Sequence, residues 1–476
     1  MSSIVGRFLN WGLVPMYTRV FEDHVYGVVS NLYAYVAFLL VILTFGMETA
    51  FFRFSGKNDH PDRVFSTTLL AVLAACLLFL GLLLFNIDPV SVWMEYPGQK
   101  NFIIWMAITV SFDAFISIPF AKLRFDSRPL RFSAIKLIGI ALNIGLNLFF
   151  LLLCPWIIKV HPEWNWINLV YSEDIGVGYV FISNLLASGI TLILLFPEIF
   201  SVKLKFDFSI LKQMLKYGIP LLIVGIAAQV NINIDKILLP KLIPSELNPL
   251  GQLGIYAANY KIAVLMAMFI QAFRYSFEPF FFSHHKGEES KKVYADVMKY
   301  FFLFGMLIFL GVMFYIDIVQ YYIGSGYRTG LKVVPLILLA NLFQGIYYSL
   351  SLWYKLTDKT QYGAYISIFG GFVTLILNFL LIPVLGYLGS AIAVFVCYFL
   401  MMTISYFLGK KHFFVDYDLK LMLFYFVLGL GLYGISEWIR IESMALRMTF
   451  NTLLLLLFLA VLSYRERSLI KKLLGK

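Results

Sequence analysis

Charged residues are scarce in this sequence, and three features that would point to soluble functions are missing. Asp, Glu, Lys and Arg make up 14% of the 476 residues, whereas a soluble domain has about a quarter. The three cysteines, at 76, 154 and 397, show no paired spacing, so we expect neither a disulfide framework nor a cysteine metal site. The P-loop pattern G-x-x-x-x-G-K-[ST] does not occur, which excludes an ATPase built on that motif. No small-residue cleavage site follows the first apolar stretch, so we expect no cleaved signal peptide.

Hydrophobic residues are correspondingly abundant. They make up 61% of the chain and fall in blocks of about twenty, the length that a helix needs to cross roughly 30 Å of hydrocarbon. We therefore predict an all-α integral membrane protein with about 14 transmembrane helices and short connections. The expected spans are 1–20, 26–46, 65–86, 102–121, 132–153, 178–196, 217–239, 255–273, 300–316, 333–353, 362–382, 388–407, 421–438 and 445–464.

The basic residues predict the orientation of these spans. The net charge of +11 is compatible with nucleic-acid binding, but the Lys and Arg residues collect in alternate connections. One set of connections, with the tail from residue 465, holds 25 of the 38, and the other set holds nine. The positive-inside rule then predicts that both termini are cytoplasmic. It also places Trp156, Trp164 and Trp166 outside, and it argues against a nucleic-acid partner.

A short internal repeat appears at an offset of about 228 residues. Gly27 and Tyr33 parallel Gly254 and Tyr260, each pair at the start of a predicted membrane helix. Repeats of six helices are common in secondary transporters, whose substrate site lies between the halves. The spacing predicts a six-helix lobe over 1–200, a second over 201–412, and two additional helices with a tail over 413–476.

Two other motifs have structural explanations. The G-x-G-x-x-G pattern that starts at Gly429 lies inside an apolar helix, where small residues favour close helix packing rather than dinucleotide binding. His284, His285, Glu288 and Glu289 could bind a metal at their spacing. They continue into a lysine pair, which favours a solvated loop.

Polar residues inside the predicted spans are the candidates for function. A charge at mid-membrane costs at least about 2.5–3.5 kcal/mol, so it usually faces a bundle interior or a wet cavity. Lys136, Asn143 and Asn147 share one helix face at steps of seven and four. The cationic and amide candidates for a substrate cavity are Arg7, Asn10, Lys136, Asn143, Asn147, Lys261, Arg274, Asn341, Gln344 and Tyr348. This lining suits an anionic ligand that is rich in hydroxyl groups. The acids that could couple transport to an ion gradient are Glu48, Asp113, Asp235 and Glu278.

Several motifs resemble a known family. They are Arg7-Phe-Leu-Asn10, the Pro15-Met-Tyr-Thr-Arg-Val-Phe21 stretch, Gly46-Met-Glu-Thr-Ala-Phe-Phe-Arg-Phe54, Tyr217-Gly-Ile-Pro-Leu221 and Asp235-Lys-Ile-Leu-Leu239. They resemble bacterial polysaccharide transporters, the Wzx-like O-antigen flippases of the multidrug/oligosaccharidyl-lipid/polysaccharide exporter superfamily. Members carry more chain before the first motif. We therefore expect either that the first helix begins upstream of Met1 or that it is short and packed against the bundle.

The resemblance implies two six-helix lobes around a central cavity in the bacterial inner membrane. It implies transfer of undecaprenyl-diphosphate-linked oligosaccharide from the cytoplasmic to the periplasmic leaflet, without a cofactor, and coupling to a proton or sodium gradient is compatible with it. Membrane lipid, a polysaccharide polymerase and a chain-length regulator are the other partners it implies. Arg7, Lys136 and Lys261 would then hold the diphosphate. The sugar hydroxyls would be contacted by Asn143, Asn147, Asn341, Gln344 and Tyr348.

Three alternatives stay open at this point. A multidrug exporter of the same superfamily would bind cations through acids in its first lobe, whereas the first helix here has Arg7 and no acid. A flippase for the lipid-linked peptidoglycan precursor suits an anionic ligand equally well. A membrane enzyme such as an oligosaccharide polymerase would need a large outer loop, but the longest one expected here has about 24 residues, with His161, Glu163, Glu173 and Asp174 as its reactive groups. We expect no enzyme activity.

Overall fold

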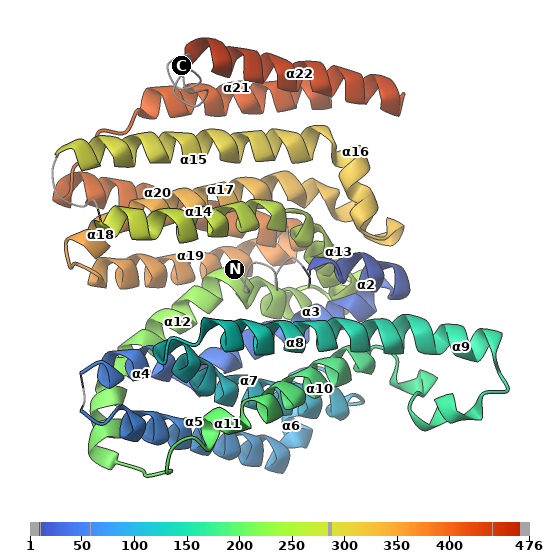
Figure 1. Ribbon diagram of the computed structural model, residues 1–476. Helices are drawn as coiled ribbons and strands as arrows, with labels where there is room; N and C mark the ends of the chain where they lie inside the picture. The colour runs from blue at the N-terminus through green and yellow to red at the C-terminus, as the bar shows by residue number, and fades with distance from the viewer. Residues whose placement is uncertain (1–8, 10, 58, 284–287, 440, 467–476) are drawn as a thin grey trace. The chain divides into compact units, whose positions relative to one another are not determined.

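The computed structural model describes residues 9, 11–57, 59–283, 288–439 and 441–466, and for 278–283 and 288–290 it describes the backbone alone. Arg7 and Asn10 lie outside these residues, as do His284 and His285. The described chain is helical and contains no strand, and it divides into two compact units, Met1–Gly254 and Ile255–Lys476 (Figure 1). The expected boundaries at 200 and 412 stay a prediction.

The helices of the first unit account for predicted spans two to seven. They are α2 (Val14–Val20), α3 (Asp23–Thr44), α4 (Met47–Ser55), α5 (Pro61–Phe85), α6 (Ile87–Trp93), α7 (Lys100–Phe125), α8 (Pro129–Leu148), α9 (Cys154–Val160), α10 (Gly178–Leu194), α11 (Phe196–Ile199) and α12 (Phe208–Leu242). A π-helical turn, Phe149–Leu153, joins α8 to α9 without a break. Helix α13 (Pro249–Ile262) starts in this unit and ends in the second.

Local sequence explains where several of these helices begin. Proline occupies the first position of α5 and of α8, where its missing N–H removes no helix hydrogen bond. The carboxylate of Asp207 accepts hydrogen bonds from the N–H groups of Ser209 and Ile210 and caps α12. Between α3 and α4, Phe45 and Gly46 both adopt left-handed conformations, with φ of 32° and 74°, and they divide what would otherwise be one helix.

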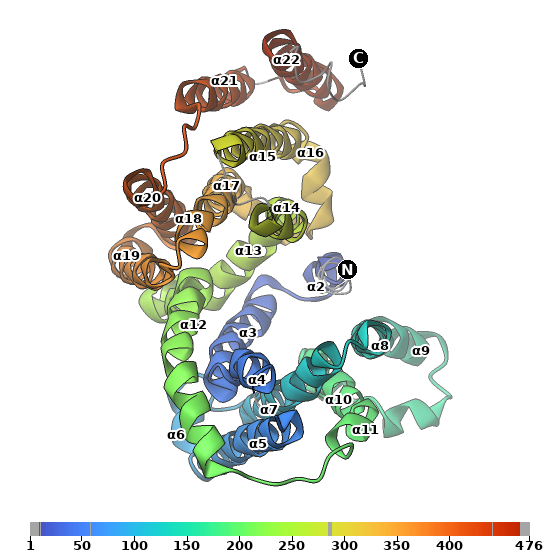
Figure 2. The same ribbon diagram turned by 60° about the vertical axis from the view of Figure 1, so that its left-hand side comes forward.

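Helix α7 is central to the first unit. It packs against α3, α5, α8 and α10, and Figure 2 shows α5 and α7 side by side. Phe51, Phe65, Val110 and Ala114 belong to one buried cluster at the contact of α4, α5 and α7. Because lipid offers helices no hydrophobic gain from association, this close packing is the main attraction between them.

The two glycines of the internal repeat meet within the first unit. A Cβ added to Gly27 would lie 1.9 Å from the carbonyl oxygen of Leu250, and one added to Gly254 would lie 1.9 Å from that of Asp23. The contact is reciprocal, since each glycine faces the residue four positions before the other. The starts of α3 and α13 therefore touch backbone to backbone.

The second unit accounts for predicted spans eight to fourteen. Of the first predicted span, α2 lies in the first unit, and residues 1–8 and 10 lie outside the described residues. The elements of the second unit are α14 (Val264–Ser283), α15 (Glu288–Phe314), α16 (Ile316–Val319), a 3₁₀ segment (Ser325–Val333), α17 (Val334–Leu350), α18 (Leu352–Leu356), α19 (Gln361–Leu385), α20 (Tyr387–His412), α21 (Leu419–Trp438) and α22 (Met444–Arg465). Helix α17 is central here and packs against α14, α15 and α20. The two last helices pack on α15, and Lys299 of α15 pairs with Glu466 at 3.0 Å. Arg447 of α22 pairs with Asp317 of α16 at 2.6 Å.

The all-α membrane fold predicted from the sequence is confirmed. Eleven helices in the described residues are long and apolar enough to cross a membrane, and the bent pair α13–α14 makes a twelfth if it is one span. The apolar helix α10 is shorter, at 17 residues. The chain is a multi-pass membrane protein, and the total of about fourteen crossings stays a prediction.

Candidate functional site

The predicted polar face of the fifth span lies on α8. Asn147 is fully buried, and its amide donates to the backbone carbonyl of Asn143 at 2.7 Å and to the side-chain oxygen of Asn143 at 3.1 Å. The hydroxyl of Tyr17 on α2 donates to the Asn147 amide oxygen at 2.9 Å. Lys136 is half-buried and lies about two helical turns, roughly 10 Å along the axis, before Asn143, and about three turns before Asn147. Its ammonium lies 5.6 Å from the Phe132 ring centre. We call Tyr17, Lys136, Asn143 and Asn147 the α8 cluster.

A second polar group surrounds Asp113 on α7. The hydroxyl of Ser188 on α10 donates to the Asp113 carboxylate at 2.7 Å. One turn earlier on α10, the amide of Asn184 donates to the hydroxyl of Tyr33 on α3 at 3.1 Å. A carboxylate inside an apolar helix is costly unless it has partners, so Asp113 stays a candidate for a functional position. The sequence analysis missed Asn184 and Ser188, although their spacing of four places both on one face of an apolar helix.

Two other acids from the sequence analysis form ion pairs inside the first unit. Glu48 pairs with Arg124 at 2.6 Å, and the two side chains are 43% and 40% exposed. Asp235 is buried on α12 and pairs with the adjacent Lys236 at 3.2 Å. Each acid therefore has a basic partner in this structure, and a coupling role for either stays a prediction.

Lys261 lies beside a break in the eighth span. Helix α13 ends at Ile262, α14 begins at Val264, and the two axes differ by 46°. The amide of Asn341 on α17 donates to the carbonyl of Ala263, which lies in the break, at 3.1 Å. The half-buried Lys261 is in the last turn of α13, where the helix dipole favours a positive charge. Broken membrane helices of this kind form substrate and ion sites in transporters.

The remaining candidates of the second unit gather on α14, α17 and α20. The Arg274 guanidinium lies 4.4 Å from the ring centre of Tyr348, a cation–π contact. The amide of Gln344, one turn from Tyr348, donates to the hydroxyl of Tyr398 at 2.6 Å. We call Arg274, Gln344, Tyr348 and Tyr398 the α17 cluster. Glu278 is on α14, but its side chain lies outside the described residues.

Titratable groups that could hold a metal do not cluster in the described part of the chain, where no group of three His, Cys, Asp or Glu side chains meets. The three cysteines are free and buried. In the connection after α9, the Glu163 carboxylate bonds its own backbone and His161, which lowers the pKa of Glu163. This pair is exposed, so it is a surface contact.

Comparisons with known proteins identify similar folds among solved structures. No family model matches the sequence, and no curated protein matches it either. Among solved structures, the lipid II flippase MurJ in an inward closed conformation is 15% identical, with a TM-score of 0.71 over 98% of each chain. An inward-facing MATE multidrug resistance transporter of the MOP superfamily is 14% identical, with a TM-score of 0.67 over 86% of this chain and 94% of its own.

The fold is that of MATE and MurJ transporters. A MOP superfamily transporter from Pyrococcus furiosus, described as having a binding pocket of reversed polarity, shares it at 13% identity with a TM-score of 0.53, over 86% of this chain and 93% of its own. At these identities the likeness establishes the MATE/MurJ fold and not a ligand. The specific resemblance to Wzx-like flippases stays a prediction, as do the assigned cavity residues.

Proposed function

We propose that this protein is a MOP-superfamily flippase that moves undecaprenyl-diphosphate-linked oligosaccharide from the cytoplasmic to the periplasmic leaflet of the bacterial inner membrane. The observation that carries the proposal is the chemistry of the two clusters. In the first unit, Lys136 lies on the same helix as the amides Asn143 and Asn147 of the α8 cluster. In the second unit, Arg274 contacts Tyr348 in the α17 cluster. The likeness to MurJ over nearly the full length of both chains supports the same class of ligand, a lipid with a polar head.

The basic residues would bind the diphosphate. Lysine acts on phosphate as a point charge without fixed geometry, which suits a ligand that must move. In an interior of low effective dielectric, a cation gains far more from a phosphate than at a wet surface. Lys136 and Lys261 have these properties, and Arg7, outside the described residues, is the third proposed cation.

The amides and tyrosines would bind the sugars, and their burial ranks them as candidates. Asn147 and Asn341 are buried, and each donates to a protein acceptor, Asn143 and Ala263 respectively. They stabilise helix α8 and the break in the eighth span. Asn143, Gln344 and Tyr348 are half-buried, so they are the better candidates for contacts with sugar hydroxyls.

A deletion strain tests this proposal. Loss of a flippase should cause lipid-linked oligosaccharide to accumulate and surface polysaccharide to disappear, and the wild-type gene should restore both. Lys136→Ala with Lys261→Ala should not restore them, whereas the matched control Lys159→Ala, an exposed lysine on α9, should. Equal rescue by the double variant and the control would remove both lysines from the mechanism.

The same deletion strain distinguishes this proposal from the alternative of a flippase for the lipid-linked peptidoglycan precursor. A protein that serves cell-wall synthesis would rescue cells depleted of the lipid II flippase, and its own deletion would stop growth. A protein that serves surface polysaccharide would do neither. The proposal expects viable deletion cells that lack only surface polysaccharide.

A cation exporter is the second candidate because of Asp113. This acid lies inside an apolar helix of the first unit, with the Ser188 hydroxyl as a hydrogen-bond donor. An exporter of this kind would lose drug resistance with Asp113→Asn and would leave polysaccharide unchanged. If Asp113 instead couples flipping to an ion gradient, the same variant reduces surface polysaccharide and leaves resistance unchanged.

A further inference from the structure

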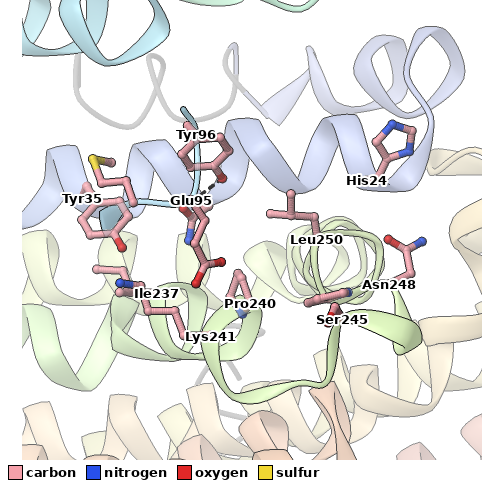
Figure 3. Close-up of a pocket in the computed structure, with 13 residues that line it drawn as sticks. His24, Tyr35, Glu95, Tyr96, Ile237, Pro240, Lys241, Ser245, Asn248 and Leu250 are labelled. Atoms are coloured by element: carbon pink, nitrogen blue, oxygen red, sulfur yellow. Dashed lines mark hydrogen bonds between the residues drawn. The ribbon is translucent and has the colours of Figure 1, made fainter. Parts of the chain in front are cut away.

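A separate cavity of about 280 Å³ lies at one end of the first unit. Its walls come from the start of α3, the connection after α6, the end of α12 and residues 245–250, which lead into α13 (Figure 3). The volume equals the liquid share of about nine water molecules at roughly 30 Å³ each. It is just below the range of about 300–1,000 Å³ for drug-sized ligands. The cavity therefore has room for a single small ring with its substituents.

Two polar groups in this cavity lack protein partners. The Tyr35 hydroxyl is buried and makes no hydrogen bond with any described residue. Glu95 is exposed, and its carboxylate makes no ion pair or hydrogen bond within the described part of the chain. Figure 3 shows both this carboxylate and the Tyr35 hydroxyl directed toward the end of α12. A buried hydroxyl without a partner costs folding free energy, so its retention needs a reason.

The backbone at Glu95 is also unusual. Its φ is 69°, in the left-handed region that a non-glycine residue seldom adopts. Glu95 is the residue that follows the C-cap of α6, and the N–H groups of Glu95 and Tyr96 donate to the carbonyls of Val92 and Ser91. This is the common pattern in which a left-handed residue ends a helix. The end of α6 therefore places the Glu95 carboxylate at the wall of the cavity.

Three other polar lining residues, Asn31, Tyr96 and Lys241, are hydrogen-bonded to protein groups. Burial raises the pKa of Tyr96, so its hydroxyl stays protonated and donates to the Asn31 side-chain oxygen at 3.1 Å. The Asn31 amide in turn donates to the Lys236 carbonyl at 2.8 Å. Lys241 lies 3.9 Å from the Trp93 ring centre and donates to the Trp93 carbonyl at 3.1 Å.

The charged groups disfavour an anionic ligand. Among the thirteen described lining residues, Glu95 and Lys241 are the two with a fixed charge. Lys241 contacts Trp93, so the Glu95 carboxylate is the charged group open to a ligand. A carboxylate accepts several hydrogen bonds, and a tyrosine hydroxyl both donates and accepts, so together they match vicinal hydroxyl groups. Apolar lining from Leu250, Pro240 and Ile237 matches the C–H faces of a sugar ring.

We infer that this cavity binds one neutral monosaccharide ring, with Glu95 and Tyr35 as its hydrogen-bonding groups. The inference goes beyond the proposed function, since the site belongs to the first unit and does not include the α8 or α17 cluster. It concerns equilibrium binding of a sugar, so a failure here leaves the flippase proposal intact, and the reverse also holds.

Saturation-transfer NMR on the purified full-length protein tests the inference. The probes are D-glucose, D-galactose, L-rhamnose and N-acetyl-D-glucosamine, with tetramethylammonium and inorganic phosphate as charged competitors. We expect saturation transfer to at least one sugar, and no competition by either ion. Tyr35→Phe should weaken binding about 3–10-fold, and Glu95→Gln about 10-fold or more, from the loss of a neutral and of a charged hydrogen bond.

Matched controls and stability measurements make the outcome decisive. Tyr365→Phe, on an exposed tyrosine of α19, and Glu163→Gln, on an exposed glutamate, should leave binding unchanged. Because the Tyr35 hydroxyl has no described protein partner, Tyr35→Phe should be as thermally stable as the wild type or more so. The inference is overturned if no sugar shows transfer, if both site variants bind like the wild type, or if tetramethylammonium displaces the sugar.

Discussion

The reciprocal glycine contact between α3 and α13 allows a sharp test of the packing. A Cβ at Gly27 or at Gly254 would lie 1.9 Å from a carbonyl oxygen, whereas real Cβ contacts essentially never fall below 3.0 Å. Replacement of either glycine by alanine must therefore separate the two backbones by about 1 Å. Overpacking of this kind costs about 1–3 kcal/mol. It opposes the gain of about 0.5–1 kcal/mol that alanine brings to a helix interior.

The control substitutions should have the opposite effect on thermal stability. Gly81 on α5 and Gly431 on α21 have no atom within 4 Å of an added Cβ, so alanine there should leave thermal stability unchanged or raise it. Gly27→Ala and Gly254→Ala should each lower the melting temperature of the purified protein. One separation of the helices relieves both clashes, so the double variant should lose less stability than the sum of the single variants. The reasoning is refuted if either single variant melts at or above the wild-type temperature.

Three further predictions concern function, the helix break and topology. Lys136→Ala and Lys261→Ala should each reduce surface polysaccharide while the amount of the protein in the membrane stays unchanged. Arginine at either position should retain part of the activity, and glutamate should reduce it more than alanine does. Wild-type activity of the glutamate variants would contradict this prediction. Asn341→Leu leaves the Ala263 carbonyl without its partner and should destabilise the protein by about 1–3 kcal/mol, measured as a fall in melting temperature; unchanged stability with lost transport would return Asn341 to ligand binding. A cysteine at Trp164 should react with an impermeant thiol reagent in cells with a permeabilised outer membrane, and one at Lys203 should not; the reverse pattern would invert the orientation.

The positions of the helices could be predicted because blocks of about twenty apolar residues suffice to define a membrane helix. The residues at which the helices begin and end could be predicted less well. The seventh span was expected over 217–239, but α12 covers Phe208–Leu242, since the Asp207 cap starts the helix in its polar part. No proline or glycine marks the break at Ala263 in the sequence. The Ala263 carbonyl accepts a hydrogen bond from Asn341, which is 78 residues away.

The candidate site was predictable where one helix face carried the signal. Asn143 and Asn147 were placed together by spacing alone, and they are hydrogen-bonded on α8. Residues whose role depends on contacts with other helices could not be predicted from spacing along one helix. Tyr35 and Glu95 meet only because α3 and the connection after α6 line the same cavity, and nothing in their local sequence marks them.

The central claim, that this protein moves lipid-linked oligosaccharide across the membrane, is tested most directly in spheroplasts. Spheroplasts from the deletion strain, with or without the wild-type gene, would be treated with impermeant periodate, which oxidises only outward-facing sugars. The oxidised fraction of undecaprenyl-diphosphate-linked oligosaccharide would then be measured. We predict that this fraction is high with the wild-type gene and falls to background both in the deletion strain and with the Lys136→Ala/Lys261→Ala variant. An equal oxidised fraction with and without the wild-type gene would contradict the account.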